Sequence, residues 1–169
     1  LDVLAAYEAE SFQTDKAAGE KSKMPSDQLF EPDNAAVINS FVSSTQDYRL
    51  LSYLTRLNYD YDNRYYIAGS FRRDGSSRLA PEHRWGNFWS VGAAWRISQE
   101  NFMENYSSWL DELKLKASIG QQGNDNIGSW AYTDMYTLTA TNETTMSPTF
   151  WRIGNPDITW ETTTNINVG

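Results

Sequence analysis

Alternation of apolar and polar residues over unusually long stretches is the feature that most constrains this chain. In residues 51–61 the odd positions are Leu, Tyr, Thr, Leu, Tyr and Tyr, whereas the even positions are mostly polar. The pattern returns in residues 65–73, 85–97, 113–121 and 158–168, and more weakly in residues 2–10. Because successive side chains of a strand point to opposite faces, the pattern predicts strands with one apolar and one polar face.

The length of these stretches narrows the fold class further. Most run roughly 9–12 residues, whereas strands of globular proteins usually have about 5–6. A tilted strand that crosses a membrane needs about 9–11 residues, and a soluble sandwich accommodates six such strands poorly. The sequence therefore predicts an all-β fold, an antiparallel up-and-down meander of about six long strands. These lie near residues 2–10, 48–61, 65–74, 86–97, 113–121 and 158–168.

The connections support a barrel wall. Asp62-Asn63-Arg64 is expected to form a tight turn, because Asp and Asn tolerate left-handed backbone. Residues 98–112 are expected to contain a short amphipathic helix through Phe102, Tyr106, Trp109 and Leu110. The connections at residues 11–47, 74–84 and 122–157 would emerge on the opposite side. Short turns on one side and long loops on the other are typical of outer-membrane barrels, although the 98–112 connection is longer than the 74–84 loop.

The aromatic residues of the apolar face fall near the strand ends when the short turns are placed toward the periplasm. Two aromatic girdles with small aliphatic residues between them are what bilayer interfaces select, and chance clustering is the alternative. The predicted lipid-facing girdle consists of Tyr59, Tyr61, Tyr65, Trp89, Trp95 and Trp160. The predicted lumen-facing cations of the polar face are Arg56, Arg72, Arg96, Lys114 and Lys116.

Composition excludes several function classes. The 169 residues include no Cys, which removes disulfides and thiol chemistry, and one His, His83, which removes multi-histidine metal sites. A formal net charge of −8 argues against nucleic acid as a partner. No apolar run reaches the roughly 18 residues of a membrane helix. This criterion does not apply to the strands of a membrane barrel, in which apolar and polar residues alternate. Leu1 is not an initiator Met and the chain stops within an alternating pattern, so we expect a fragment of a longer polypeptide.

Six segments, in this order, resemble the barrel of SusC/RagA-type TonB-dependent outer-membrane transporters. They are YRLLSYLTRLNYDYD (residues 48–62), FRRDGSSR (71–78), RWGNFWSVGAAWRIS (84–98), WLDELKLKASIG (109–120), GN (123–124) and NPDITWETTT (155–164). Residues 11–47 and 129–154 match nothing recognisable, as expected of loops that vary with cargo.

The resemblance implies a barrel of about 22 strands in the outer membrane, in contact with lipid and filled by an N-terminal plug. It implies import of oligosaccharides or peptides, energised by TonB and assisted by a SusD-like lipoprotein. Residues 1–169 would then be a fragment of the barrel domain, without the plug, the TonB box or the remaining strands. The lumen-facing cations would either contact the plug or form a hydrated wall.

Other motifs carry weaker functional hypotheses. In the last long loop, aromatic side chains would either stack on sugar rings or fold the loop onto itself; they are Trp130, Tyr132, Tyr136, Phe150 and Trp151. Arg73 would either meet lipopolysaccharide phosphates or lie before an Asp-Gly turn that ends its strand, with Arg72 paired to a neighbouring strand.

Catalysis has little support in the sequence. Residues 120–126 are rich in side-chain oxygens but lack the spaced acidic ligands of a calcium loop. His83 lies beside Glu82 in a short loop, and no Ser sits in a nucleophile elbow. We predict no catalytic residue, cofactor or metal. The alternative to a transporter wall is a soluble all-β glycan-binding module, and an enzyme ranks third.

Overall fold

The structure is a computed structural model that describes residues 1–28, 31–106, 109–142 and 144–169. Its strands are β1 (Asp2–Ser22), β2 (Val37–Tyr61), β3 (Tyr65–Ser76), β4 (Trp85–Arg96), β5 (Lys114–Asn124), β6 (Met135–Ala140), β7 (Met146–Arg152) and β8 (Glu161–Val168). Three short 3₁₀ helices are η1 (Pro32–Asn34), η2 (Ile97–Gln99) and η3 (Asn101–Tyr106). The chain forms two compact units, one made of Leu1–Glu10 with Arg49–Gly169 and the other of Ser11–Tyr48.

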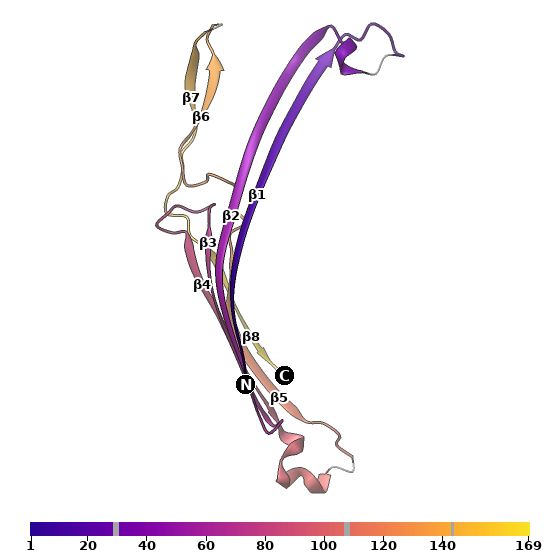
Figure 1. The fold of residues 1–169 in the computed structure, drawn as a ribbon, viewed down its shortest axis with the longest axis vertical. Coiled ribbons are helices and arrows are strands. Elements are labelled where there is room, and N and C mark those ends of the chain that lie inside the picture. Colours follow the sequence, from indigo (N-terminus) through magenta and orange to yellow (C-terminus); the bar gives the residue numbers. More distant parts are fainter. Residues whose placement is uncertain (29–30, 107–108, 143) are drawn as a thin grey trace. The chain divides into compact units, whose positions relative to one another are not determined.

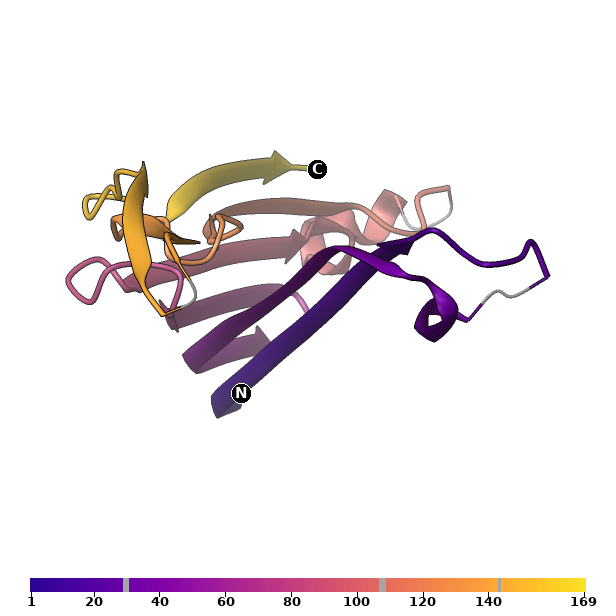
Figure 2. The same cartoon turned by 90° about the horizontal axis from the view of Figure 1, so that it is seen from above.

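Six of the strands form one sheet in the order β1-β2-β3-β4-β5-β8 (Figure 1). From β2 to β8 each neighbouring pair is antiparallel. Figure 2 shows β8, in yellow, at the edge of the sheet beside β5. The predicted antiparallel meander is thus confirmed, with the β6–β7 hairpin inserted before its last strand.

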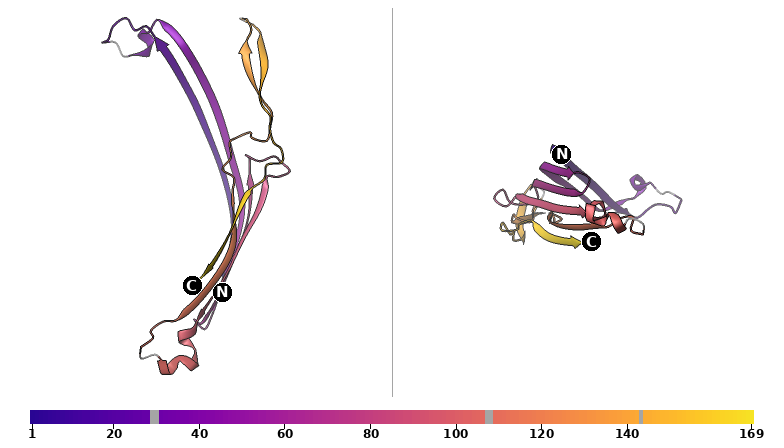
Figure 3. Two further views of the ribbon diagram at one scale, coloured as in Figure 1. Left: turned by 180° about the vertical axis from the view of Figure 1, so that it is seen from behind. Right: turned by 90° about the horizontal axis from the view of Figure 1, so that it is seen from below.

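The turn between β2 and β3 has the backbone that its residues predict. Asp62 and Asn63 both have positive φ, 52° and 51°, which Asp and Asn tolerate better than most residues. The Arg64 N–H closes the turn on the Tyr61 carbonyl at 3.0 Å. This turn and the η2–η3 connection lie at the same end of the sheet, called here the turn end (Figure 3). The opposite end, from which residues 77–84 leave β3, is called the loop end.

The prediction of a loop at residues 11–47 is largely wrong, because β1 continues to Ser22 and β2 already begins at Val37. Nearly every side chain of these extensions is exposed, so neither face needs apolar residues and no alternation marks the strands. Polar pairs across the hairpin take their place: Thr45 Oγ1 donates to Asp15 at 2.8 Å, and Asn39 Nδ2 donates to Glu20 at 3.2 Å. Each cross-strand pair of this kind stabilises the hairpin by roughly 0.2–1 kcal/mol, in addition to the backbone hydrogen bonds.

The loop predicted at residues 122–157 also contains structure, the β6–β7 hairpin. Its pairs alternate between apolar ones, such as Tyr136 with Phe150, and hydroxyl ones, such as Thr137 with Thr149. The segment expected to hold an amphipathic helix instead forms the 3₁₀ helices η2 and η3, followed by the Leu110 N–H bonded to the Tyr106 carbonyl at 3.1 Å. No helix within the described ranges is long and apolar enough to cross a membrane.

Candidate functional site

The two faces of the six-stranded sheet carry different chemistry, and the strand register decides which residues share a face. One transverse row is apolar and consists of Leu57, Gly69, Val91, Ile119 and Ile166. The next row points to the opposite side and consists of Arg56, Ser70, Ser90, Gly120 and Asn165. We call the first side the apolar face and the second the polar face. Val91 is 49% exposed and Ile166 is 70% exposed, so no part of the chain that the structure describes covers this row of the apolar face.

An aromatic belt crosses the apolar face at the turn end. The rings of Tyr61 and Tyr65 lie 6.4 Å apart, and those of Tyr65 and Trp95 stack at 6.5 Å. Glu100, the residue directly after η2, is hydrogen-bonded to two rings of this belt. It accepts hydrogen bonds from the Tyr65 hydroxyl at 2.6 Å and the Trp95 indole at 3.0 Å, and the Arg64 guanidinium lies 3.6 Å away. These donors, first of all the Tyr65 hydroxyl, hold the pKa of the Glu100 carboxyl below its ordinary value.

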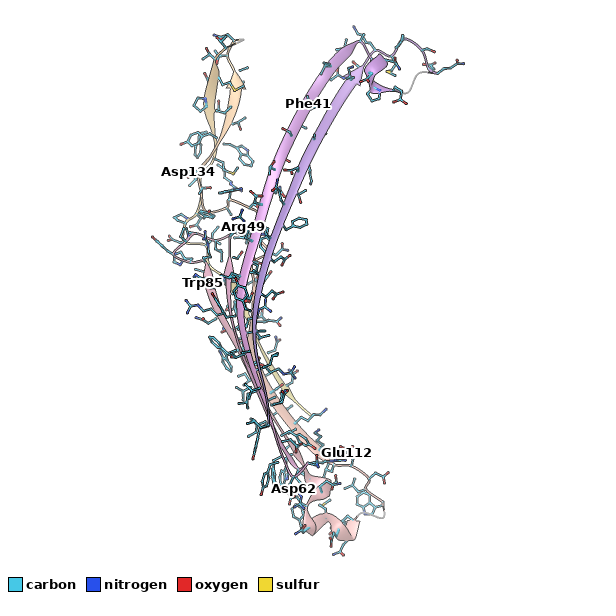
Figure 4. All side chains as sticks on the ribbon, viewed as in Figure 1. Phe41, Arg49, Asp62, Trp85, Glu112 and Asp134 are labelled. Carbon is cyan, nitrogen blue, oxygen red and sulfur yellow. The ribbon has the colours of Figure 1, made fainter. Side chains whose placement is uncertain are left out.

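A second aromatic belt crosses the same face at the loop end. Tyr53 lies between Tyr7 and Trp85, with ring centroids 5.5 and 6.2 Å away. Gly75 pairs with Trp85, and a Cβ on Gly75 would come within 2.9 Å of the indole ring. The missing side chain therefore lets the indole lie flat across β3. Figure 4 shows Trp85 far along the sheet from Asp62 at the turn end.

Five of the six residues predicted for the lipid-facing girdle share the apolar face: Tyr59, Tyr61, Tyr65, Trp89 and Trp95. Trp160 does not join them. Its indole N–H donates to the Arg84 carbonyl at 2.9 Å, and its ring meets the edge of Phe88 at 5.2 Å. Phe88 pairs with Arg72 on the polar face. The prediction for Trp160 fails because β8 begins only at Glu161, so alternation does not extend to position 160.

The five predicted lumen-facing cations all lie on the polar face: Arg56, Arg72, Arg96, Lys114 and Lys116. Their surroundings differ. Arg72 donates to Asp74 at 2.7 Å, to Glu8 of β1 at 3.0 Å and to Ser52 at 2.9 Å. Lys114 lies 4.4 Å above the Tyr66 ring, a cation–π contact, and Arg96 lies 3.5 Å from Glu112. The Arg72 group ties three strands together across the polar face.

A hollow of about 780 Å³ opens on the polar face toward the turn end. Its floor is one transverse row of short side chains, consisting of Asn58, Ala68, Gly92, Ser118 and Asn167. Asp2, Asp60, Tyr66 and Lys116 also line it. The hollow therefore offers small polar groups and charges of both signs. Within the described residues no three His, Asp or Glu side chains gather closely enough to hold a metal ion.

Comparisons with curated proteins give relatives of one kind, although no family model matches the sequence. The chain is 36% identical over 148 residues to the TonB-dependent receptor SusC of Bacteroides thetaiotaomicron. This match covers 82% of this chain and 14% of SusC. The chain is also 35% identical over 132 residues to the TonB-dependent receptor P39 of Formosa agariphila. That match covers 78% of this chain and 13% of the receptor. The chain thus spans 13–14% of the length of these relatives.

A comparison with solved structures agrees with the sequence relatives over almost the whole chain. The structure of the RagAB peptide importer in its closed-closed state matches with a TM-score of 0.88 and 30% identity, covering 98% of this chain and 18% of that one. The chain is a SusC/RagA-type barrel segment. The six strands of the sheet are therefore SusC/RagA-type barrel strands, and the alternation of their faces is that of a barrel wall.

The candidate ligand-contacting aromatics of this SusC/RagA-type segment fall into separate groups. Trp130 pairs with Tyr132 at 6.4 Å before the β6–β7 hairpin, and Tyr136 meets Phe150 edge-on at 5.6 Å within it. Trp151 lies under the Arg152 guanidinium at 5.3 Å. The rings of Trp130, Tyr136, Phe150 and Trp151 are about half exposed or more. Their contact with a ligand stays a prediction.

The sequence did not predict a hydrogen-bonded cluster at the loop end of this SusC/RagA-type segment, called here the polar knot, which joins residues 76–78 to Asp125 and Arg49. The Ser76 hydroxyl, fully buried, donates to Asp125 at 2.6 Å, and Arg78 Nη1 donates to the Asp125 carbonyl at 3.3 Å. The Ser77 N–H reaches the Arg49 carbonyl at 2.9 Å. The knot thus fastens the 77–84 connection to β2 and to the chain after β5. No pattern in the sequence links residues 76 and 125, since an isolated Ser and Asp carry no spacing signal.

Proposed function

We propose that this chain forms part of the lipid-facing wall of an outer-membrane TonB-dependent transporter that imports large nutrients. The observation that carries the proposal is the apolar face, uncovered and bounded by aromatic belts at both ends. In β3 the belts lie at Tyr65 and Gly75, so about ten residues separate them. At about 3.3 Å per residue and a tilt near 40°, this gives a height of about 25 Å, the height of the apolar band of outer-membrane barrels.

The proposal extends to the whole receptor. We infer that the parent protein carries a plug and a TonB box outside this segment and works with TonB and a SusD-like lipoprotein. Oligosaccharides or peptides are the proposed cargo; the second class draws on the RagAB neighbours, which are described as a peptide importer and a peptide transporter. The polar face would then line the lumen, where hydrated cations such as Arg56 cost little to maintain.

Two adjacent residues of β5 test the membrane wall directly. Ala117 pairs with Ala93 on the apolar face, whereas Ser118 pairs with Gly92 on the polar face, and both are exposed. Single Cys variants at each position of the full-length receptor are labelled with a fluorophore in vesicles that contain a lipid-borne quencher. We expect quenching at position 117 and little at position 118. Equal quenching, or none at either position, sinks the proposal and favours a soluble glycan-binding module.

A further inference from the structure

Charge on the apolar face is confined to its loop end. Among the described strand positions of the Leu1–Glu10 and Arg49–Gly169 unit, this face carries no Asp or Glu, and its charged residues are Arg49 and Arg73. Arg73 lies in the row of Tyr53 and Asn87, and Arg49 occupies the next apolar-face position beyond Leu51. Both cations therefore lie where the apolar face ends, and both have the same sign.

Arg73 differs from its neighbour Arg72 in how its charge is balanced. Arg72, on the polar face, is held by Asp74 and Glu8 at 2.7 and 3.0 Å. Arg73 is exposed, and within the described residues no carboxylate lies at ion-pair distance from it. Its guanidinium instead lies 5.3 Å from the centre of the Trp85 ring, in the loop-end belt. The indole fixes the direction of the side chain and leaves the N–H donors free for an acceptor.

The location of Arg73, at the end of the apolar face, indicates what kind of acceptor it binds. A guanidinium binds a phosphate through paired hydrogen bonds, and the exposed Asn87 amide beside it supplies another donor. The next row toward the middle of the sheet presents the exposed rings of Phe71 and Trp89, and the row after it is apolar from Leu57 to Ile166. The matching ligand therefore has a phosphate beside an acyl chain. We propose that Arg73, aided by Asn87 and by the charge of Arg49, binds the phosphate of a lipid headgroup at the loop end. This inference rests on the proposed function, since it needs lipid against the apolar face.

The test uses the full-length receptor, as wild type and as Arg73→Gln, with Arg56→Gln as a control that makes the same charge change on the polar face. Affinity for lipid A carrying both phosphates, and for its dephosphorylated form, is measured by native mass spectrometry of the detergent-solubilised receptor. We expect the wild type and Arg56→Gln to prefer the phosphorylated form by about fivefold, the effect of one Arg at an anionic membrane surface. Arg73→Gln should lose this preference.

The outcomes separate the possible anions and the two proposals. Inorganic phosphate added in excess should leave the lipid bound, and displacement of the lipid would show a free-anion site and overturn the headgroup assignment. A preference that survives Arg73→Gln, or that Arg56→Gln abolishes equally, also overturns it. Quenching at position 117 without any phosphate preference removes this inference alone, whereas the absence of quenching removes the membrane wall and this inference together.

Discussion

At the scale of single residues, Arg72 is the partner that the described part of the chain gives to the carboxylate of Asp74. Asp74 is 7% exposed, and its two carboxylate oxygens share the single N–H of Arg72 Nε, at 2.7 and 2.8 Å. A buried charge that loses its partner keeps its desolvation penalty, whereas removal of both partners leaves no such charge. The contribution of Arg72 is therefore best measured together with that of Asp74.

We expect Arg72→Met to lower the free energy of unfolding of the full-length receptor by about 2–4 kcal/mol, because the Asp74 carboxylate loses its partner. Arg56→Met removes an exposed cation of the same face and should change this free energy by less than about 0.5 kcal/mol. Denaturant unfolding from detergent micelles measures both. The double variant Arg72→Met/Asp74→Leu should recover much of the loss, and an Arg72→Met effect no larger than that of Arg56→Met would contradict the prediction.

Glu100 gives the turn end a dependence on pH. Its pKa lies below the ordinary value near 4.5, mainly because the Tyr65 hydroxyl and the Trp95 indole donate to the charged form. A lowered carboxyl pKa means that the stabilisation is complete above the ordinary value and is lost as the pH falls through the lowered one. We expect Glu100→Gln to speed amide exchange in residues 97–106 at neutral pH, and to have no effect once the pH is below the lowered pKa. Glu82→Gln, in an exposed loop, serves as the control, and a pH-independent effect of Glu100→Gln would argue against this role.

At the scale of elements, the β6–β7 hairpin is closed at its base and separable from the sheet. The Gly154 N–H donates to Asp134 Oδ1 at 2.8 Å, and the Asn155 N–H donates to the Ala131 carbonyl at 3.0 Å. Because these contacts bring the two ends together, a short Gly-Ser linker can replace residues 135–153. We expect the full-length receptor to assemble normally with this linker, as measured by heat-modifiable migration in gels, while cargo uptake falls. Uptake at the wild-type rate would remove the proposed role of the hairpin aromatics.

The sequence predicted the strands of the sheet better than the hairpins outside it. In β3 to β5 and in the second half of β2 one face is mostly apolar, so alternation is strong there; the predicted bounds of β3 to β5 and the predicted end of β2 lie within a few residues of the observed ones. The extensions of β1 and β2 are exposed on both faces, and no contrast marks them. The β6–β7 hairpin does alternate, with Tyr136 and Leu138 against Thr137 and Thr139, but each run is short. Contacts such as Ser76 with Asp125 depend on how loops fold back, which no local pattern records.

At the scale of the whole molecule, the chain has little of a conventional core. Four hydrophobic residues are buried among those described, Ala35, Leu79, Ala80 and Phe88. The accessible surface is 12922 Å², whereas a compact protein of this mass, 19.3 kDa, exposes about 8500 Å². The backbone ladder, the aromatic belts and the polar clusters hold the sheet, and burial among the described residues supplies only a small hydrophobic contribution. In the proposed setting the acyl chains of lipids add to that contribution.

The closed base of the β6–β7 hairpin also has a consequence for the order of folding. The pairing of β5 with β8 joins strands separated by a connection of roughly 36 residues, numbers 125–160. When Asp134 and Gly154 meet first, the loop still to be closed shortens to roughly 17 residues. The entropic cost of closing a loop grows as the logarithm of its length, so an early hairpin lowers the free-energy cost of pairing β5 with β8 by about 0.7 kcal/mol. If this cost is part of the folding barrier, the pairing becomes roughly threefold faster. If the hairpin closes first, we therefore expect faster pairing of β5 with β8 than for an open connection of the same length.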